Sequence, residues 1–383
     1  MAPPLRMALI GGGFIGRSHG LAISAVARTF QDLPLRPVPY ILCDSDPVRA
    51  EATAASMGFA RHTTDWRVAV AECDALIIAV PSRFHAEIAR AAIARSLPLL
   101  CEKPVGLSAA EAQDLADAAD AAGVVNAVGF TYVRAPMLRV AAGLLAAGRI
   151  GAPVHFTARH AEDYLARPDL PFTWRLDAGM AGPCGALGDL GCHILAAARL
   201  LCGPVQSVLG MASTVHAQRR DASGAMRRVE NEDHAAFLVR FSGGVPGMLE
   251  ASRVAHGRKM DFSFELTGER GTLRFEAERT NELQLFVDEG EPGERGFRRL
   301  LIDPAHPDFA AFLPAPGHGL GFNDLKTIEL RDFVAGIAGR HSVPPDLQEA
   351  ARIARVCEAV LASSASGQWI ESPEARPCAA RPV

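Results

Sequence analysis

MALIGGGFIG, residues 7–16, places a short apolar run directly before a G-x-G-x-x-G pattern. The alanine-rich residues 14–30 that follow are typical of a helix, so the glycines lie in a strand–turn–helix setting. Glycines in this setting allow a tight turn, close approach of the backbone to a pyrophosphate, and packing of helix on strand. The helix N-terminus also offers free N–H groups to phosphates. The motif therefore predicts a dinucleotide-binding unit.

The pattern continues outward from this loop as alternating strands and helices. Apolar runs predict strands at Met7–Ile10, Val38–Cys43, Ala75–Val80, Leu97–Cys101 and Val124–Val128. Helical stretches lie between them at 14–30, 47–57, 83–95 and 109–122. Continuous apolar strands that alternate with helices indicate a parallel sheet covered on both faces. We therefore expect an α/β fold that begins with a doubly wound Rossmann domain over residues 1–128.

Beyond residue 129 the strands follow one another instead of alternating with helices. They are expected at 231–241, 247–253, 260–267, 271–275 and 283–287, with helices at 136–148, 192–202, 322–338 and 345–364. Such a succession favours an α+β domain, residues 129–383, with a mostly antiparallel sheet and helices on one face.

Composition excludes several classes of function. The 383 residues are 49% hydrophobic and 21% charged with a formal net charge of −4, which gives no electrostatic reason to expect nucleic acid. No apolar run is long enough to cross a membrane, and no secretory signal is visible, so we expect a cytoplasmic protein. The eight cysteines form no C-x-x-C pair and predict reduced thiols. The spacing of Cys184, Cys192 and His193 does not match a closed zinc site, so we expect no metal.

Polar residues at the predicted strand ends are candidates for cofactor binding. Asp44 follows the second strand, where a carboxylate binds ribose hydroxyls and repels a 2′-phosphate, which favours NAD over NADP. Alternatively, Asp44 or Asp46 only caps the next helix, and Arg49 accommodates the phosphate of NADP. Pro81, Ser82 and His85 follow the third strand; the simpler interpretation is a helix N-cap and a first-turn histidine.

Two further motifs carry candidate catalytic groups. In Glu102-Lys103-Pro104 the lysine follows another strand, beside the expected nicotinamide, unless it is merely solvated; its bond to proline is a candidate for the cis form. Asp189 and His193 are four residues apart, on one helix face. Histidine with its pKa near 6.5 accepts a hydroxyl proton, and the carboxylate would fix its tautomer. A core-edge histidine near a capping aspartate is the alternative.

Together these motifs resemble the Gfo/Idh/MocA family of oxidoreductases, which includes glucose–fructose oxidoreductase and inositol dehydrogenase. The resemblance also includes Gly129-Phe130-Thr131-Tyr132-Val133-Arg134, Gly148-Arg149-Ile150-Gly151, Trp174-Arg175 and residues 185–193. It implies a second domain whose open sheet binds substrate and forms oligomer contacts. It also implies hydride transfer between nicotinamide and a ring carbon of a sugar or polyol, with His193 as base, Asp189 as its orienting partner and Lys103 as hydrogen-bond donor.

The residues assigned to the cofactor are Gly11, Gly13, Phe14, Ile15, Gly16, Asp44, Pro81, Ser82, His85, Glu102 and Lys103. Those assigned to substrate are Lys103, Tyr132, Arg134, Trp174, Arg175 and His193. Trp174 and Arg175 lie in a stretch, 159–177, rich in aromatic and polar side chains, whereas Arg134 has a structural role as its alternative. Ala196 and Thr131 stand where the family often has aspartate and asparagine, which indicates a less hydroxylated or differently oriented substrate.

The sequence thus predicts an NAD(P)-dependent dehydrogenase that oxidises a secondary hydroxyl of a sugar, cyclitol or related polyol and works as a homodimer or homotetramer. Two alternatives stay open. One is a glycoside-processing enzyme that recycles NAD in place; the other is a non-catalytic sensor of sugar or dinucleotide.

Overall fold

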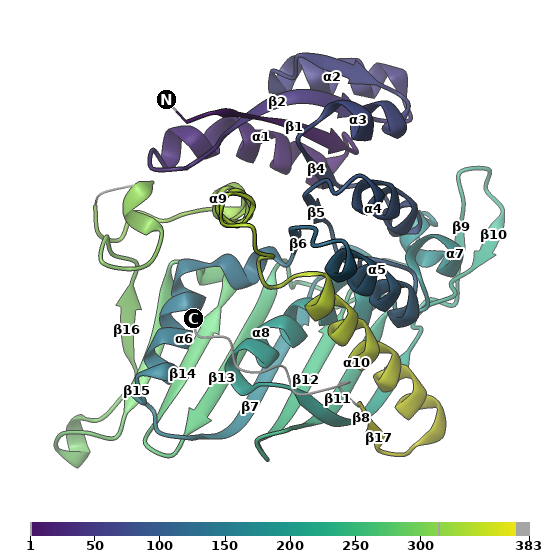
Figure 1. Cartoon of the computed structure of the whole chain (residues 1–383). Coiled ribbons are helices and arrows are strands. Elements are labelled where there is room, and N and C mark those ends of the chain that lie inside the picture. The colour runs from purple at the N-terminus through teal and green to yellow at the C-terminus, as the bar shows by residue number, and fades with distance from the viewer. Residues whose placement is uncertain (1, 313–314, 373–383) are drawn as a thin grey trace.

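The computed structural model describes residues 2–312 and 315–372 and contains two large sheets (Figure 1). The first has six parallel strands in the order β3-β2-β1-β4-β5-β6, which is the order typical of the Rossmann fold. These strands are β1 Pro4–Ile10, β2 Arg36–Cys43, β3 Arg61–Thr63, β4 Ala75–Ile78, β5 Leu99–Cys101 and β6 Asn126–Val128. The helices of this Rossmann unit are α1 Phe14–Thr29, α2 Pro47–Met57, α3 Trp66–Glu72, α4 His85–Ala94 and α5 Ala109–Ala121. The predicted α/β fold with a parallel Rossmann sheet is confirmed.

The central strands of this sheet are apolar on both faces, since every residue of β4 and β5 is buried. Strand β3 and helix α3 are absent from the prediction. Both are short, and β3 lies at the exposed edge of the sheet, so neither produces a clear apolar pattern.

The second sheet has nine strands in the order β16-β15-β14-β13-β7-β12-β11-β8-β17. Only β7 and β12 pair in parallel, so the sheet is mixed but mostly antiparallel, as predicted. The strands are β7 Pro153–Ala161, β8 Val205–Ser213, β11 His234–Phe241, β12 Pro246–Ser252, β13 Asp261–Gly268, β14 Gly271–Glu276, β15 Glu282–Val287, β16 Arg298–Leu301 and β17 Ile370–Glu371.

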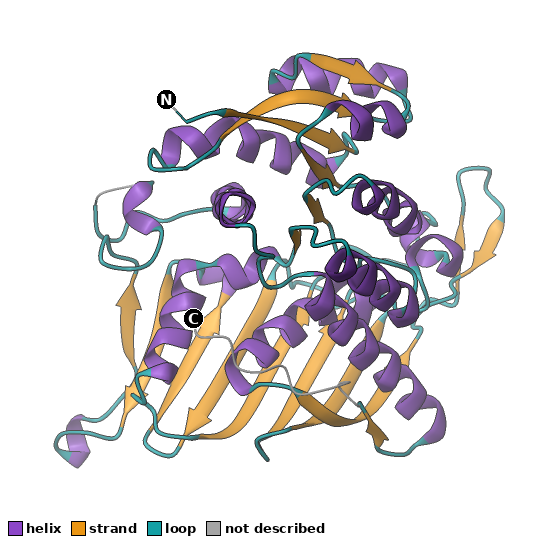
Figure 2. Ribbon diagram, in the orientation of Figure 1, coloured by secondary structure: helices purple, strands orange, loops and turns teal. Residues whose placement is uncertain are grey.

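Helices cover one face of this second sheet (Figure 2). They are α6 Pro136–Ala146, α8 Cys192–Cys202 and α10 Leu347–Ser366. Helix α10 also packs against α5, and α9, Phe322–Gly339, packs against α1 of the Rossmann unit. The C-terminal part of the chain therefore contributes to both sheets, and the proposed division at residues 128 and 129 stays a prediction.

The other face of the second sheet carries exposed apolar side chains. Along β11 the residues alternate between buried and outward-facing, and Leu238 on this strand is 44% exposed. Met248, its direct neighbour on β12, and Met211 on β8 are also exposed. An apolar strip across neighbouring strands is typical of a surface that contacts another protein.

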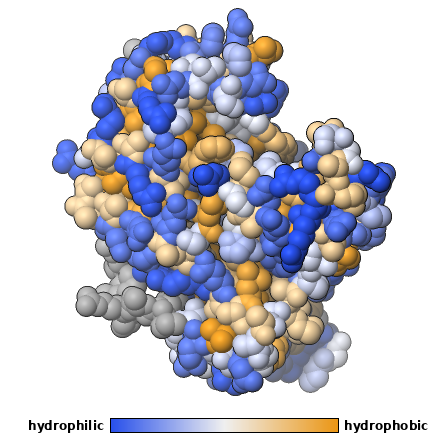
Figure 3. Space-filling model, turned by 90° about the vertical axis from the view of Figure 1, so that its right-hand side faces the viewer, coloured by the Kyte–Doolittle hydropathy of each residue, from blue (hydrophilic) through white to orange (hydrophobic). Residues whose placement is uncertain are grey.

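A small two-stranded hairpin stands apart from both sheets (Figure 1). It consists of β9 Gln218–Arg220 and β10 Met226–Arg228, and it lies near the short helix α7, Ala178–Ala181. On the side of the molecule shown in Figure 3, hydrophobic residues form patches among hydrophilic ones. Within the described ranges, no helix has the length and apolar character needed to span a membrane.

Seven cysteines lie within the described residues, and all seven are free thiols. Cys378 lies outside those residues.

Candidate active site

The glycine-rich loop between β1 and α1 has the geometry of a dinucleotide cradle. A Cβ atom at Gly16 would lie 1.8 Å from the carbonyl oxygen of Gly11, and one at Gly11 would lie 2.4 Å from that of Ala79. By contrast, the space around Gly13 is open to 4 Å. Helix α1 begins after Gly13 without a side-chain cap, so no capping side chain satisfies its first N–H groups, which are the groups that bind phosphates at a helix N-terminus. These observations fit a bound pyrophosphate.

Asp44 at the end of β2 is buried and held by four hydrogen bonds. Its Oδ2 accepts the N–H of Gly12 at 2.8 Å, and Oδ1 accepts the N–H of Asp46 at 3.0 Å. Arg49 donates to both carboxylate oxygens, at 2.9 and 2.7 Å. Burial alone would raise the pKa of Asp44, but these hydrogen bonds outweigh it and lower the pKa. Asp46, not Asp44, caps α2, which leaves Asp44 beside the glycine loop as a charged carboxylate.

The other predicted cofactor residues lie around the same edge of the sheet. Phe14 is 82% exposed at the start of α1, as expected of an apolar side chain that a ligand covers. Pro81 and Ser82 follow β4 in the turn before α4. His85, however, is fully buried, with Nε2 2.7 Å from the carbonyl oxygen of Val80 and Nδ1 2.8 Å from that of Pro104. Its ring therefore joins two turns of the site instead of facing the cofactor directly.

Lys103 and Asp189 meet although they are 86 residues apart. The ammonium of Lys103 donates to Asp189 Oδ1 at 2.8 Å and to the Asp189 carbonyl oxygen at 2.7 Å. Burial lowers the pKa of Lys103, but the charge of Asp189 outweighs it and the pKa is raised. Burial raises the pKa of Asp189, but the positive charge of Lys103 outweighs it and the pKa is lowered. Lys103 is thus a charged hydrogen-bond donor. The contact brings the turn of Glu102-Lys103-Pro104 (the lysine turn) to the segment that carries Asp189 and His193 (the histidine helix), as expected for residues that share one site.

The predicted pairing of Asp189 with His193 is wrong. Nδ1 of His193 is buried and has no hydrogen-bond partner within the described part of the chain. Residues 187–191 form a π-helical turn before α8, so the spacing rule for residues four apart in an α-helix does not apply here. Asp189 instead orients Lys103.

His193 lies among aromatic rings. The centroid of its ring is 4.6 Å from that of Tyr132, 5.6 Å from that of His160 and 5.9 Å from that of Phe130. Burial, with the positive charge of Lys103 as the second cause, lowers its pKa well below the usual value near 6.5. The imidazole is therefore neutral at neutral pH and able to accept a proton.

The opposite side of Asp189 carries polar side chains from the stretch 159–177. The hydroxyl of Tyr164 donates to Asp189 Oδ2 at 2.7 Å, and Nε of Arg175 lies 3.4 Å from the same oxygen. Arg175 also stacks on Trp174, with 4.5 Å between guanidinium carbon and ring centroid. Tyr164 is not among the predicted site residues, although it lies in this aromatic and polar stretch, which was the available signal.

Arg134, a predicted substrate residue, and Thr131, which stands where the family often has asparagine, both contact α9. Arg134 is buried and forms an ion pair with Asp332 of α9 at 3.0 Å, which indicates a structural role in place of the predicted substrate contact. Thr131 is also buried and donates to Glu329 at 3.4 Å. By contrast, Tyr132 lies against His193 and keeps its predicted place in the site.

Glu102 belongs to a buried ionic cluster beneath the lysine turn, which replaces its predicted cofactor contact. Its Oε1 lies 2.5 Å from Nζ of Lys326 and 2.8 Å from Nε2 of His19. The same ammonium donates to Glu329 at 2.8 Å. Burial raises the pKa of Glu102, but Lys326 and His19 outweigh this and lower it. The positions of His19, Glu102 and Glu329 would also suit a metal ion, but the Lys326 ammonium already supplies the positive charge.

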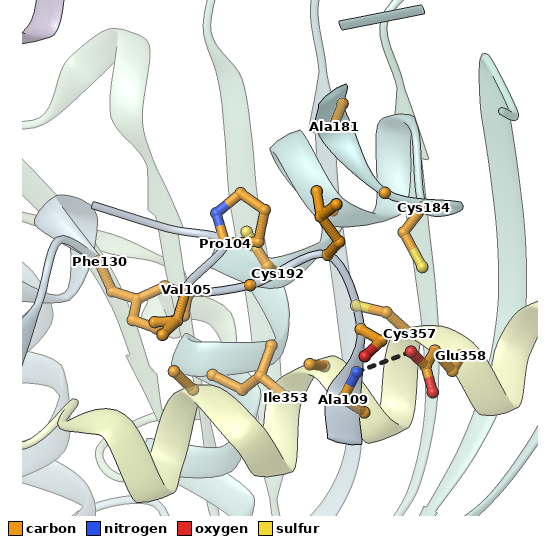
Figure 4. Close-up of a pocket in the computed structure, with 17 residues that line it drawn as sticks. Pro104, Val105, Ala109, Phe130, Ala181, Cys184, Cys192, Ile353, Cys357 and Glu358 are labelled. Carbon is orange, nitrogen blue, oxygen red and sulfur yellow. Dashed lines mark hydrogen bonds between the residues drawn. The ribbon is translucent and has the colours of Figure 1, made fainter. Parts of the chain in front are cut away.

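A small, partly open pocket adjoins the site (Figure 4). Pro104, Phe130, Cys184, Cys192 and Cys357 are among the residues that line it. It therefore borders the lysine turn and the histidine helix, but Lys103, Asp189 and His193 do not line it. This pocket is distinct from the place where the catalytic side chains converge.

A Rossmann sheet with this glycine loop and a buried lysine and histidine at its carboxyl edge defines a nucleotide-dependent oxidoreductase. Family models agree: residues 5–130 match "Oxidoreductase family, NAD-binding Rossmann fold", and residues 138–274 match "GFO/IDH/MocA C-terminal domain". The chain belongs to the Gfo/Idh/MocA family. The predicted family, its NAD-binding domain and its class as an oxidoreductase are thereby confirmed.

Known relatives match along nearly the whole chain. Levoglucosan dehydrogenase of Pseudarthrobacter phenanthrenivorans is 34% identical over 97% of this chain and 98% of its own. The structure of levoglucosan dehydrogenase in complex with NADH and levoglucosan superimposes with a TM-score of 0.94 over 97% of this chain and all of that one. An oxidoreductase domain protein from Kribbella flavida is 37% identical, with a TM-score of 0.93 over 98% of this chain and all of its own.

Two glycine substitutions are predicted to separate folding from cofactor binding. Gly16→Ala forces a Cβ atom against the Gly11 carbonyl oxygen, so it should lower both the melting temperature and the affinity for NADH. Gly13→Ala meets no neighbouring atom in the protein. It should therefore keep the melting temperature and weaken only NADH binding. Thermal unfolding and fluorescence titration with NADH measure the two effects; equal behaviour of both variants would contradict this interpretation.

Lys326→Met is predicted to destabilise the fold by about 3–5 kcal/mol at neutral pH, because Glu102 and Glu329 lose their buried counter-ion. The pKa of Glu102 is lowered in the native protein, so its stabilising effect is present above its usual value near 4.5 and is lost in acid. The difference between the two proteins in urea unfolding should therefore shrink below that pH. A double variant with Glu102→Gln should recover part of the loss.

Proposed function

We propose that this protein is an NAD-dependent dehydrogenase that oxidises a secondary hydroxyl of a sugar, with an anhydro sugar of the levoglucosan type as substrate. The observation that carries the proposal is the convergence of a charged Lys103, held by Asp189, and a neutral His193 at the carboxyl edge of the Rossmann sheet. Whole-chain similarity to levoglucosan dehydrogenase supports the choice of substrate.

In this proposal the chain's residues manage one proton while the cofactor takes the hydride. Bound NAD⁺ supplies the hydride acceptor, C4 of its nicotinamide ring. The neutral imidazole of His193 accepts the hydroxyl proton, and a positioned base of this kind accelerates a reaction by about 10²–10⁴-fold. The ammonium of Lys103 donates a hydrogen bond to the same oxygen and favours its negative charge as the C–O bond becomes a carbonyl.

The residues that would hold the cofactor are those of the glycine loop, Phe14, the Pro81–Ser82 turn and Asp44. We propose NAD over NADP because the charged Asp44 carboxylate repels a 2′-phosphate. Its ion pair with Arg49 leaves that carboxylate in place, since backbone N–H groups of Gly12 and Asp46 hold it as well.

The sugar would lie between His193 and the stretch 159–177. Trp174 offers an aromatic face, and Arg175 offers a guanidinium that is 44% exposed. Tyr132 borders the same space from the His193 side. A compact sugar suits a site that combines aromatic side chains with hydrogen-bond donors.

We also propose that the apolar strip of Leu238, Met248 and Met211 pairs with a second copy of the chain, as a homodimer or, by a further contact, a homotetramer. A cytoplasmic location fits the free thiols of the described residues. Net NADH formation distinguishes this dehydrogenase from the recycling glycoside-processing enzyme.

Lys103→Met and His193→Gln should each lower the kcat for sugar oxidation by about 10²–10⁴-fold, because each removes a group that acts on the reacting oxygen. The dissociation constant for NADH should change little. Rapid-mixing absorbance at the NADH band measures the first, and fluorescence titration the second. Retention of the native rate by both variants would exclude the assignment.

The wild-type protein should reduce NAD⁺ with levoglucosan as substrate. The rate of cofactor reduction should be higher with NAD⁺ than with NADP⁺, and higher with levoglucosan than with free aldoses or inositols. A screen of these sugars with both cofactors measures this directly. Conversion of a glycoside without accumulation of NADH would instead favour the recycling enzyme, and the absence of any turnover would favour the sensor.

A further inference from the structure

The loop of residues 162–178 presents the substrate-side groups to the catalytic residues. Its Tyr164 hydroxyl donates to Asp189, and its Arg175 lies beside the same carboxylate. The following inference rests on the proposed function, in which these side chains adjoin the sugar. The loop contains only turns and one 3-10 helical turn, Trp174–Leu176, before α7 begins at its last residue, so its shape depends on what packs against it.

The β9–β10 hairpin packs against this loop. The backbone N–H of Phe172 donates to the carbonyl oxygen of Arg220 at 2.7 Å, and the guanidinium of Arg227 lies 4.2 Å from the ring centroid of Phe172. Arg227 also forms an ion pair with Asp177 at 3.1 Å. Between hairpin and loop lies a hydrophobic cluster separate from the main core, whose buried members are Leu165, Leu176 and Val229.

One side chain of the hairpin, Arg219, is directed into the loop. It is only 1% exposed, whereas its strand neighbours Gln218 and Arg220 face solvent. Its Nη2 donates to the carbonyl oxygen of Leu165 at 2.5 Å. Its Nη1 lies 2.7 Å from the carbonyl oxygen of Arg167 and 3.3 Å from that of Leu170, the two further acceptors.

This arrangement is unusual for packing alone. Within the described residues no ion pair joins Arg219 to a carboxylate, and the nearby Asp233 is engaged by Arg253 at 2.9 Å. A buried charge is unfavourable unless hydrogen bonds compensate for it, and a hydrophobic side chain would fill the same volume without that cost. The presence of a guanidinium at this buried position is therefore explained by its hydrogen bonds to three carbonyl groups of the loop, which it holds together.

We propose that Arg219 is a positioning residue that sets sugar affinity by holding the 162–178 loop, and with it Tyr164, against Asp189. Leu165, whose carbonyl group Arg219 binds, directly follows Tyr164 in the chain. Loss of Arg219 frees this peptide and so loosens the Tyr164 contact to Asp189. The glycine loop follows β1 of the other sheet, and the side-chain hydrogen bonds of Arg219 within the described residues all end on the 162–178 loop, so we expect the affinity for the cofactor to stay the same.

Arg219→Gln tests this role, with Arg220→Gln on the same strand as the matched control. We expect Arg219→Gln to raise the KM for levoglucosan by at least ~10-fold, since hydrogen bonds from a charged donor to three acceptors are lost. The kcat should fall by a smaller factor, and the dissociation constant for NADH should stay the same. Hydrogen–deuterium exchange should become faster over residues 162–178. Arg220→Gln should leave all four quantities unchanged, and Arg219→Lys, which keeps a charged donor, should recover part of the sugar affinity.

Two results would overturn the proposal: unchanged exchange of the loop in Arg219→Gln, or faster exchange with an unchanged KM. If Arg219→Gln does not fold, Arg219→Lys carries the test, and a native KM with native exchange in that variant contradicts it. A wild-type protein that oxidises no sugar refutes the proposed function, whereas the exchange measurement still tests whether Arg219 holds the loop.

Discussion

The contact between Lys103 and Asp189 is the interaction on which the site depends. It joins the turn after β5 in the Rossmann unit to the π-helical turn before α8, with 2.8 Å between ammonium and carboxylate. Because both groups are largely buried, their mutual charge keeps the lysine protonated and the aspartate ionised despite the unfavourable burial. The same positive charge helps to keep His193 neutral. This ion pair thus gives the site both a charged hydrogen-bond donor, Lys103, and a neutral base, His193.

Further ion pairs and hydrogen bonds support the Lys103–Asp189 pair from both sides. Beneath the lysine turn, Lys326 from α9 neutralises Glu102, the residue directly before Lys103. On the substrate side, Tyr164 and Arg175 approach the remaining oxygen of Asp189. Groups fixed in this way need little rearrangement when a substrate binds, which is the general advantage of a preorganised site. Through Tyr164, the loop of residues 162–178, which Arg219 contacts, reaches the same carboxylate.

The sequence was sufficient for the elements with strong local patterns and for residues at strand ends. The glycine loop and the apolar strands follow from local patterns, and the place of Lys103 follows from the rule that carboxyl ends of parallel strands share one edge. The joint role of Lys103 with Asp189 and His193 was implied by the resemblance to the Gfo/Idh/MocA family. Partners supplied from distant segments were not predictable. Glu102 pairs with Lys326 and Arg134 pairs with Asp332, both of α9 and about 200 positions further along the chain. Local sequence spacing does not predict such pairs. The Asp189–His193 prediction failed because the spacing rule assumed an α-helix where the chain forms a π-helical turn.

The decisive measurement is a crystal structure of the protein with NADH and levoglucosan. We expect the reacting sugar carbon about 3–3.5 Å from C4 of nicotinamide, with its oxygen within hydrogen-bond distance of both Lys103 Nζ and the His193 ring. A nicotinamide ring in a different cavity from Lys103 and His193, or a sugar oxygen that contacts neither side chain, would contradict it.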